Sequence, residues 1–295
     1  MNSFFEVIFS FFKKILKVES EKVEDQVDEK VCENPVKGKK SLHIGINNYP
    51  GTANDLRGCV NDAKNWQKLL KDQYCFSTSI LTDSNATYNN VVKAIKDIID
   101  TAEPNGHIVI TFSGHGTNVR DVSGDEEDKR DEALCLYDRL LLDDQLRELL
   151  NKLPQKTLLT FISDSCHSGT VTRSFLRTLE NEESPVPRYL PPEDDEEVFT
   201  VAPSSVSKKF MIPEKDMNEI LITGCQSTEY SYDARIGGNF QGAMSANAIK
   251  ILKSNPNCTY LEFYNKLRSA LPSRNFPQSP QLEGSSKNKN NPVFS

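Results

Sequence analysis

Short apolar runs alternate with amphipathic stretches through most of the chain. The apolar runs predict buried strands: Leu42–Ile46, Phe76–Leu81, His107–Phe112, Leu158–Ser163 and Glu219–Thr223. Stretches with helical periodicity lie between these runs or follow them: Val60–Lys71, Thr87–Ala102, Asp143–Lys152, Gly242–Lys253 and Thr259–Ala270. Strands that are apolar along their whole length and alternate with helices are typical of a parallel sheet covered on both faces. The pattern therefore predicts an α/β fold.

Two internal segments do not follow this alternation. Residues 118–132, NVRDVSGDEEDKRDE, form an acidic stretch that we interpret as a loop. Residues 171–217 contain five prolines between Pro185 and Pro203, the acidic run EDDEE and no clear period. These features are typical of a long loop or a processing linker.

The two ends of the chain differ from its middle. Residues 1–18 carry a polar residue every three or four positions and Phe, Ile or Leu on the other face, which predicts an amphipathic helix. This helix is shorter than the roughly 20 apolar residues that span a bilayer. It lies either in a membrane interface or against its own domain or a partner. We expect a charged linker at 19–40, a folded domain at 41–284 and a polar tail at 285–295.

Composition and charge narrow the function classes. The chain has 35 Lys and Arg against 42 Asp and Glu, a formal net charge of −7. This charge argues against a general nucleic-acid binder, because the phosphate backbone requires a positive surface. The seven cysteines are odd in number and none are in C-x-x-C spacing. We therefore expect neither a disulfide framework nor a zinc knuckle. We expect a cytoplasmic location, and residues 1–18 are the segment that would contact a membrane.

A histidine and a cysteine each follow a predicted strand. His115 stands in SGHG after one strand, and Cys166 stands in DSCHSG after another. The carboxyl ends of parallel strands meet at one edge of a sheet, so neighbouring strands would bring the two side chains together. A thiol with an imidazole beside it is a nucleophilic pair, and the backbone N–H groups of Gly116 and Cys166 can form an oxyanion hole. His167 is the competing base, and a buried structural cysteine is the plain alternative.

These motifs resemble those of the metacaspases, which are caspase-related cysteine peptidases. The resemblance runs from about Ser41 to Gly284 and also includes GINNYPG, LRGCVNDA, GDEEDKRDEAL, LLDDQL and SPQLEG. It implies a caspase-like three-layer sandwich with a mostly parallel central sheet and helices on both faces. It also implies peptide hydrolysis through a thioester, with Cys166 as nucleophile and His115 as base, in a protein that acts as a monomer. The large-subunit-like part is then 41–170, the linker 171–217 and the small-subunit-like part 218–284.

The resemblance also implies a specificity. Metacaspases cleave protein substrates after Arg or Lys, and a basic side chain before the scissile bond needs carboxylates in its pocket. The matching positions are Asp62, Ser113 and Asp164. Read alone, Asp62 is a carboxylate favoured in the first turn of a helix, and Asp164 is a turn-forming residue.

The acidic stretch has two readings. It is either a solvated run of charge or part of a calcium site, since calcium takes six to eight oxygen ligands. The resemblance implies calcium ligands at Asp131, Asp143 and Asp144. Many relatives carry a further carboxylate after the CHSG motif, where this chain has TVTRSF with Arg173.

Basic residues in the linker are candidate sites of self-cleavage. They are Arg173, Arg177, Arg188, Lys208 and Lys209. The leading prediction is a calcium-activated, self-processing endopeptidase that cleaves after Arg or Lys. The alternative of another class is a catalytically silent caspase-like scaffold anchored by its N-terminal helix.

Overall fold

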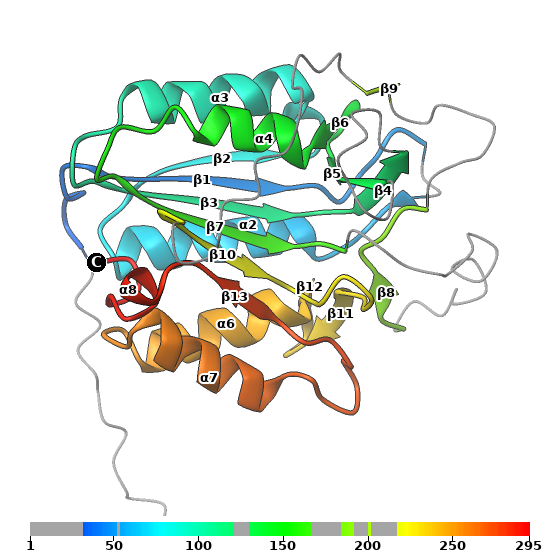
Figure 1. The fold of residues 1–295 in the computed structure, drawn as a ribbon. Helices are drawn as coiled ribbons and strands as arrows, with labels where there is room; N and C mark the ends of the chain where they lie inside the picture. Colours follow the sequence, from blue (N-terminus) through cyan, green and yellow to red (C-terminus); the bar gives the residue numbers. More distant parts are fainter. Residues whose placement is uncertain (1–31, 52–53, 121–129, 167–183, 192–199, 202–216) are drawn as a thin grey trace, which may run out of the picture. The chain divides into compact units, whose positions relative to one another are not determined.

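A six-stranded sheet forms the middle layer of the protein (Figure 1). The computed structural model describes residues 32–51, 54–120, 130–166, 184–191, 200–201 and 217–295. The strand order is β13-β10-β7-β3-β1-β2, and every neighbouring pair is parallel except β10 with β13. The strands are β1 (Lys39–Gly45), β2 (Ser77–Thr82), β3 (His107–Ser113), β7 (Leu158–Asp164), β10 (Glu219–Thr223) and β13 (Gln281–Glu283). The predicted α/β sandwich with a mostly parallel sheet is confirmed.

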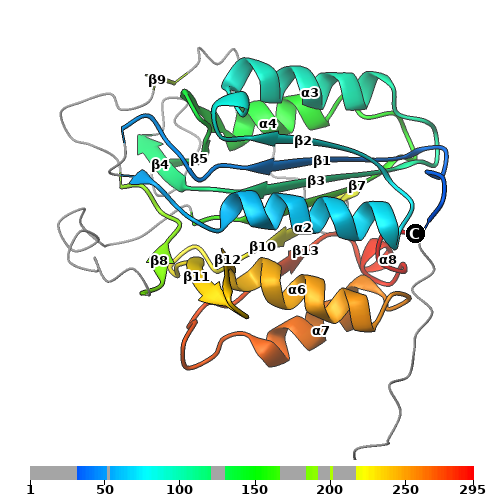
Figure 2. The same ribbon diagram turned by 180° about the vertical axis from the view of Figure 1, so that it is seen from behind.

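Helices cover both faces of this sheet, as the opposite views in Figures 1 and 2 show. One face carries α3 (Tyr88–Asp100) and α4 (Asp143–Leu150). The other carries α2 (Cys59–Asp72), α6 (Ala243–Ser254) and α7 (Tyr260–Ala270). Each of the five predicted helices is therefore present within one or two residues of its expected ends.

The central strands are buried on both faces because they feed two cores. In β3 the alternate residues Ile108, Ile110 and Phe112 belong to the core beneath α3 and α4. Val109, between them, belongs to the core beneath α2, α6 and α7. Such two-sided burial explains why these strands are apolar without alternation in the sequence.

Side-chain caps set where two of the helices begin. The Thr87 hydroxyl accepts a hydrogen bond from Asn90 N before α3, and the Thr259 hydroxyl accepts one from Glu262 N before α7. The Glu262 carboxylate in turn accepts from Thr259 N, which completes a capping box. These caps satisfy N–H groups that have no partner inside the helix.

Two smaller sheets lie at the end of the central sheet to which its parallel strands point (Figure 1). One has the order β4-β5-β6-β9 and the other β12-β11-β8. Their strands are β4 (Gly116–Arg120), β5 (Arg130–Cys135), β6 (Arg139–Leu142), β8 (Val186–Pro187), β9 (Thr200–Val201), β11 (Tyr232–Ile236) and β12 (Asn239–Gly242). Parts of the predicted acidic loop and of the predicted linker are thus strands, which is a correction to the sequence analysis.

The C-terminal residues differ from the expected polar tail. A short helix, α8 (Ser286–Lys289), follows β13, and the chain then returns to the core. The Phe294 ring is 1% exposed and makes edge contacts with the rings of Trp66, Tyr74 and Phe76. A single aromatic residue in a polar stretch was too weak a signal to predict this packing.

One disulfide joins Cys32 to Cys75, 43 residues apart. The expectation that the cysteines form no disulfide framework therefore needs correction at this pair. It rested on their odd number and on the absence of C-x-x-C spacing, and neither excludes a single bridge between distant residues. Cys59, Cys135, Cys166, Cys225 and Cys258 are free thiols. Among the residues that the structure describes, no helix has the length and hydropathy to cross a membrane.

Candidate active site

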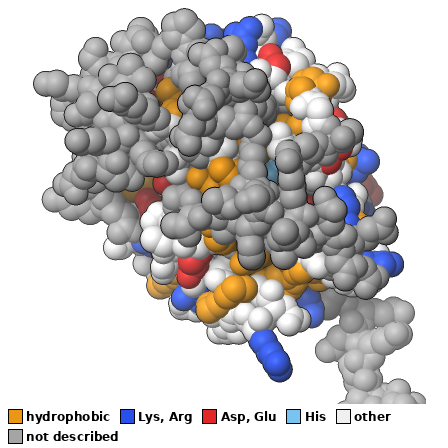
Figure 3. Space-filling view, turned by 90° about the vertical axis from the view of Figure 1, so that its right-hand side faces the viewer, with side chains coloured by type: hydrophobic (Ala, Val, Ile, Leu, Met, Phe, Trp, Pro, Cys, Tyr) orange, Lys and Arg blue, Asp and Glu red, His pale blue; other side chains and the backbone are white. Residues whose placement is uncertain are grey.

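The two predicted catalytic turns lie side by side. Strands β3 and β7 are neighbours, and their register pairs Ser113 with Asp164. His115 and Cys166 each follow these paired residues by two positions, so both turns leave the sheet at the same place. Figure 3 shows the molecule from this side, where hydrophobic and acidic side chains of described residues lie close together.

The two turns aim backbone N–H groups at one oxygen. Gly116 N and Cys166 N donate to the carbonyl oxygen of Arg188 over 3.0 and 3.1 Å. Gly116 and Cys166 are the two residues predicted to form an oxyanion hole. The geometry is that of two donors converging on a peptide carbonyl, as an oxyanion hole requires.

The His115 ring has a defined tautomer. Its Nε2 lies 2.8 Å from the carbonyl oxygen of Asn54. A carbonyl oxygen only accepts, so Nε2 carries the hydrogen, and Nδ1 is the basic nitrogen of the neutral ring. The Tyr49 hydroxyl accepts from His115 N at 2.9 Å and donates to Cys135 O at 3.1 Å, and its ring centroid lies 5.1 Å from the imidazole. His115 is therefore held on both sides.

The Cys166 sulfur is also fixed by backbone groups. Ser231 N donates to the Sγ atom at 2.6 Å, and the thiol lies 3.4 Å from Ser231 O. Cys166 is fully buried and packs against Cys225 and Tyr189. The hydrogen bond to Cys166, together with burial, raises the pKa of the Cys225 thiol.

The side chain of Arg188 is fully buried among three carboxylates. Its Nη2 lies 2.6 Å from Asp62 Oδ2 and 3.9 Å from Asp233 Oδ1, and its Nη1 lies 3.3 Å from Asp164 Oδ2. Nη1 also donates to Asp164 O at 3.1 Å. The two carboxylates predicted to line the pocket for a basic side chain thus hold one arginine.

Other hydrogen bonds fix these carboxylates. Gly242 N donates to both oxygens of Asp62 at 3.0 Å. Asp164 accepts from Ser245 N at 2.9 Å and from the Ser231 hydroxyl. A Cβ atom on Gly242 would overlap Asp164 Oδ2 and lie 2.5 Å from Arg188 Nη1, so the pocket requires glycine there.

Burial shifts the ionisation of this pocket. It raises the pKa of Asp62 to about 7, against the opposing effect of the Arg188 guanidinium. A buried carboxylate without its cation is costly, so the pocket favours a positively charged occupant.

The backbone around Arg188 runs in the manner of a bound peptide. Strand β8, which precedes it, pairs antiparallel with β11, placing Pro187 opposite Tyr232. Arg188 N donates to Ser231 O at 2.8 Å, and Leu190 N donates to Gly116 O at 2.9 Å. The chain is thus hydrogen-bonded on both sides of the Arg188 carbonyl.

The structure gives fewer contacts for the remaining predicted site residues, and some of them lie outside the described part of the chain. Ser113 is buried beside Asp164. Asp131 lies in β5, and Asp143 and Asp144 begin α4, but the described residues contain no group of three or more His, Cys, Asp or Glu side chains arranged to hold a metal. The calcium ligands therefore stay a prediction. The residues His167, Arg173, Arg177, Lys208 and Lys209 lie outside the described residues.

Several site residues were not predicted. Asp233 holds the start of α2, since its Oδ2 accepts from Arg57 N at 2.6 Å and from Gly58 N at 3.0 Å. Ser231 and Tyr49 contribute the contacts to Cys166 and His115. Tyr49 lies in the GINNYPG motif, which was a signal for its importance. Asp233 and Ser231 are ordinary polar residues in the sequence, and only the pairing of β8 with β11 reveals them.

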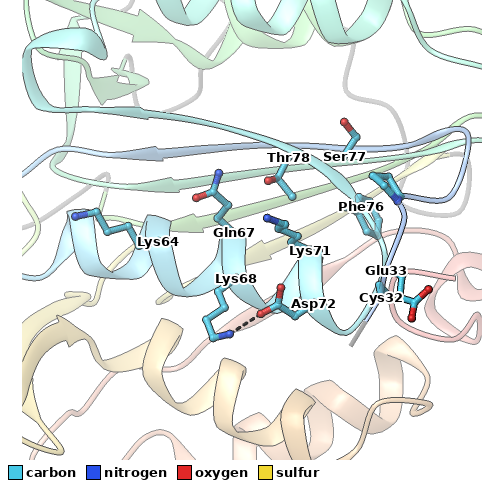
Figure 4. A pocket seen from close by; sticks show the side chains of 11 residues that line it. Cys32, Glu33, Lys64, Gln67, Lys68, Lys71, Asp72, Phe76, Ser77 and Thr78 are labelled. Atoms are coloured by element: carbon cyan, nitrogen blue, oxygen red, sulfur yellow. Dashed lines mark hydrogen bonds and ion pairs between the residues drawn. The ribbon is translucent and has the colours of Figure 1, made fainter. Parts of the chain in front are cut away.

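A separate hollow of about 570 Å³ runs along α2 beside the disulfide (Figure 4). Its lining includes Lys64, Lys68 and Lys71, and Lys68 is paired with Asp72. None of the predicted catalytic or pocket residues lines this hollow.

Known proteins match the chain at the level of sequence and fold. Residues 39–174 match the metacaspase peptidase C14 domain. The chain is 31% identical to Metacaspase-1 of Debaryomyces hansenii over 83% of its own length and 64% of that protein. It is 30% identical to Metacaspase-1 of Meyerozyma guilliermondii over 84% of its length and 69% of that protein. It therefore spans about two thirds of these relatives.

Solved structures share the fold. A crystal structure of a Geobacter sulfurreducens protein superposes with a TM-score of 0.67 and 25% identity, covering 87% of this chain and 98% of that one. Caspase-1 of Spodoptera frugiperda superposes with a TM-score of 0.52 and 11% identity, over 88% and 91% of the two chains, which supports the caspase-like fold. The chain belongs to the metacaspase family, the peptidase C14 family of cysteine-type endopeptidases.

Proposed function

We propose that the chain is an endopeptidase that cleaves after arginine or lysine, with Cys166 as nucleophile and His115 as general base and acid. The supporting observation is the position of Arg188. Its carbonyl oxygen lies between two converging N–H groups, and its guanidinium lies among three carboxylates. A substrate arginine immediately before the scissile bond, the P1 position, would occupy the same place.

We assign the steps of the reaction to these residues. The Cys166 thiolate attacks the P1 carbonyl carbon, and the oxyanion that forms is stabilised by Gly116 N and Cys166 N. His115 takes the thiol proton at Nδ1 and gives it to the amide nitrogen of the residue after P1 as the C–N bond breaks. Water, deprotonated by the same nitrogen, then hydrolyses the thioester and releases Cys166.

The same geometry supports self-cleavage between Arg188 and Tyr189. Of the five candidate sites, Arg188 is the one within the described residues. Its carbonyl oxygen and its guanidinium have the contacts that we propose for a P1 residue. In the uncleaved chain this segment excludes other substrates from the site, so the proposed enzyme is latent until the bond is cut or the segment leaves.

The remaining expectations stay predictions. Asp131, Asp143 and Asp144 are the residues that would hold calcium, which would supply positive charge beside β5 and α4. No step above depends on it. A monomeric state, a cytoplasmic location and membrane contact through residues 1–18 also remain predictions.

Turnover of a fluorogenic peptide tests the proposal. The full-length protein is expected to hydrolyse an acetyl-Val-Pro-Arg aminocoumarin substrate and its lysine analogue, but not the aspartate analogue. Cys166→Ala and His115→Ala should each lower kcat/KM at least about a thousandfold, since nucleophile and base act as a unit. Cys258→Ala, a cysteine away from the site, is the matched control.

The assay is run with added calcium and with a chelator, which tests calcium dependence separately. Turnover of the arginine peptide that survives Cys166→Ala would contradict the proposed mechanism. No turnover in either condition by protein already cut after Arg188 would favour the silent scaffold, because the uncut chain is proposed to be latent.

A further inference from the structure

Tyr189 follows the Arg188 carbonyl and is itself buried. Its side chain is 2% exposed and belongs to one apolar cluster with Cys166, Cys225 and Tyr230. The Tyr189 and Tyr230 ring centroids are 6.2 Å apart, with the planes tilted by 55°. The residue after the proposed scissile bond, P1′, therefore has an aromatic pocket beside the catalytic sulfur.

Leu190 occupies a second apolar pocket one residue further along. It is 5% exposed and packs in the core beneath α3 and α4. Its backbone N–H is held by Gly116 O at 2.9 Å, and Gly116 forms a parallel bridge with Tyr189. The same glycine that contacts the P1 carbonyl thus also positions the P1′ and P2′ residues.

The residues before Arg188 are held through backbone pairing and through partial burial, with Pro187 buried and Val186 half-buried. Strand β8 pairs with β11, with Val186 opposite Asp233 and Pro187 opposite Tyr232. Backbone hydrogen bonds of this kind accept many sequences, whereas pockets for side chains discriminate among them. The segment also buries Pro187 before the scissile bond, but Tyr189 and Leu190 after it are the two that belong to apolar clusters as buried residues.

We propose that the site selects substrates on both sides of the scissile bond, with an aromatic residue at P1′ and a branched apolar residue at P2′ after the P1 arginine. This inference rests on the proposed function and deepens it. The substrate class is an extended protein segment of the form Arg-aromatic-aliphatic, such as the chain's own Arg-Tyr-Leu at 188–190.

Matched peptides test the inference. The full-length protein is given the octapeptide Ser-Pro-Val-Pro-Arg-Tyr-Leu-Pro, residues 184–191, between a fluorophore and a quencher. Three variants carry glycine in place of the tyrosine, phenylalanine in place of the tyrosine, or serine in place of the leucine. Mass spectrometry identifies the bond that is cut in each.

The parent and phenylalanine peptides should be cut after arginine with similar kcat/KM. The glycine and serine peptides should each be cut about tenfold or more slowly, because each leaves an apolar pocket unfilled. Equal kcat/KM for all four peptides, with cleavage after arginine, would overturn this inference and leave the proposed function standing. No cleavage after arginine in any peptide would overturn the proposed function, and this inference with it.

A variant of the pocket gives an independent readout. Tyr230→Ala should bring the ratio of kcat/KM for the tyrosine peptide to that for the glycine peptide closer to one. A purely structural effect would lower both values in the same proportion, and an unchanged ratio would overturn the assignment of Tyr230 to the P1′ pocket.

Discussion

Arg188 explains more of the site than any other single residue. A guanidinium removed from water is costly unless several hydrogen bonds and charges compensate it, and Asp62, Asp164 and Asp233 do so here. The carboxylates need the cation equally, because three buried negative charges without it would repel one another. The pocket is thus built for a basic group, and the linker supplies one.

At the scale of single residues, the sequence predicts that the pocket contains carboxylates but not which side chains contact one another. Asp62 and Asp164 were identified through the family motifs that contain them. Asp233 was not, because it reaches the pocket through the pairing of β11 with β8, two residues long. A strand that short leaves no periodic pattern in the sequence.

Asp62 gives a pH-dependent prediction. With Arg188 in the pocket the pKa of this carboxyl is about 7, so an arginine should bind more tightly as the pH rises above that value. In a Cys166→Ala, Arg188→Ala protein the opposing effect of Arg188 is gone. The transition should then lie at or above pH 7. Between about pH 7 and that transition, affinity should rise by up to about tenfold per pH unit, and below pH 7 it should be independent of pH.

Titration calorimetry with acetyl-Val-Pro-Arg-amide measures this binding, and the glutamine analogue serves as the uncharged control. Adding Asp62→Asn should leave weak binding without the pH dependence. Affinity that is independent of pH in the unsubstituted pocket would contradict the role assigned to Asp62.

Individual elements were predictable where burial imposes a long pattern. Four of the parallel strands and the five helices bury two or more residues each, so their apolar residues recur over many positions, whereas the edge strand β2 is only half-buried. The small sheets do not, and β9 and β8 have two residues each. The antiparallel edge strand β13 is also short and lies in a proline-containing stretch. It therefore has no pattern from which the sequence predicts a strand.

Two histidines in the central strands are buried structural groups that the sequence pattern does not single out. His43 in β1 is fully buried and lies 2.8 Å from the Ser41 hydroxyl and 3.0 Å from the Thr111 hydroxyl. His107 in β3 lies 2.9 Å from the Thr160 hydroxyl. Burial lowers the pKa of His43 to about 3 and of His107 to about 4, so both remain neutral in the folded protein.

These pKa values predict acid sensitivity of the sheet. The unfolded histidines titrate near 6.5, so the stability they contribute is present above that pH and is lost as the pH falls toward 3–4. The free energy of unfolding should fall by about 1.4 kcal/mol per pH unit for each histidine.

Urea unfolding at pH 7 and about pH 5 measures this loss. The His43→Gln protein should lose about 2 kcal/mol less than the unsubstituted protein over that interval. An equal loss in both proteins would show that His43 does not titrate as its burial implies.

At the scale of the whole molecule, the fold brings distant segments to one place. His115 and Cys166 come from neighbouring parallel strands, the pocket carboxylates from α2, β7 and β11, and the occupant from β8 and the residues after it. The sequence predicts the first two of these through strand alternation and motif spacing. It could not predict that the linker folds back into the site, because that depends on a strand pairing and a buried ion cluster formed only in three dimensions.

The most direct test of this account is to identify the new N-terminus of the self-processed protein. The purified full-length chain is incubated under conditions in which it hydrolyses the arginine peptide, and its fragments are analysed by N-terminal sequencing and mass spectrometry. We predict a fragment that begins at Tyr189, absent from the Cys166→Ala and Arg188→Ala proteins and present with the exposed-site control Arg274→Ala. An active protein in which the bond after Arg188 stays intact, or one cut there without Cys166, would contradict the account.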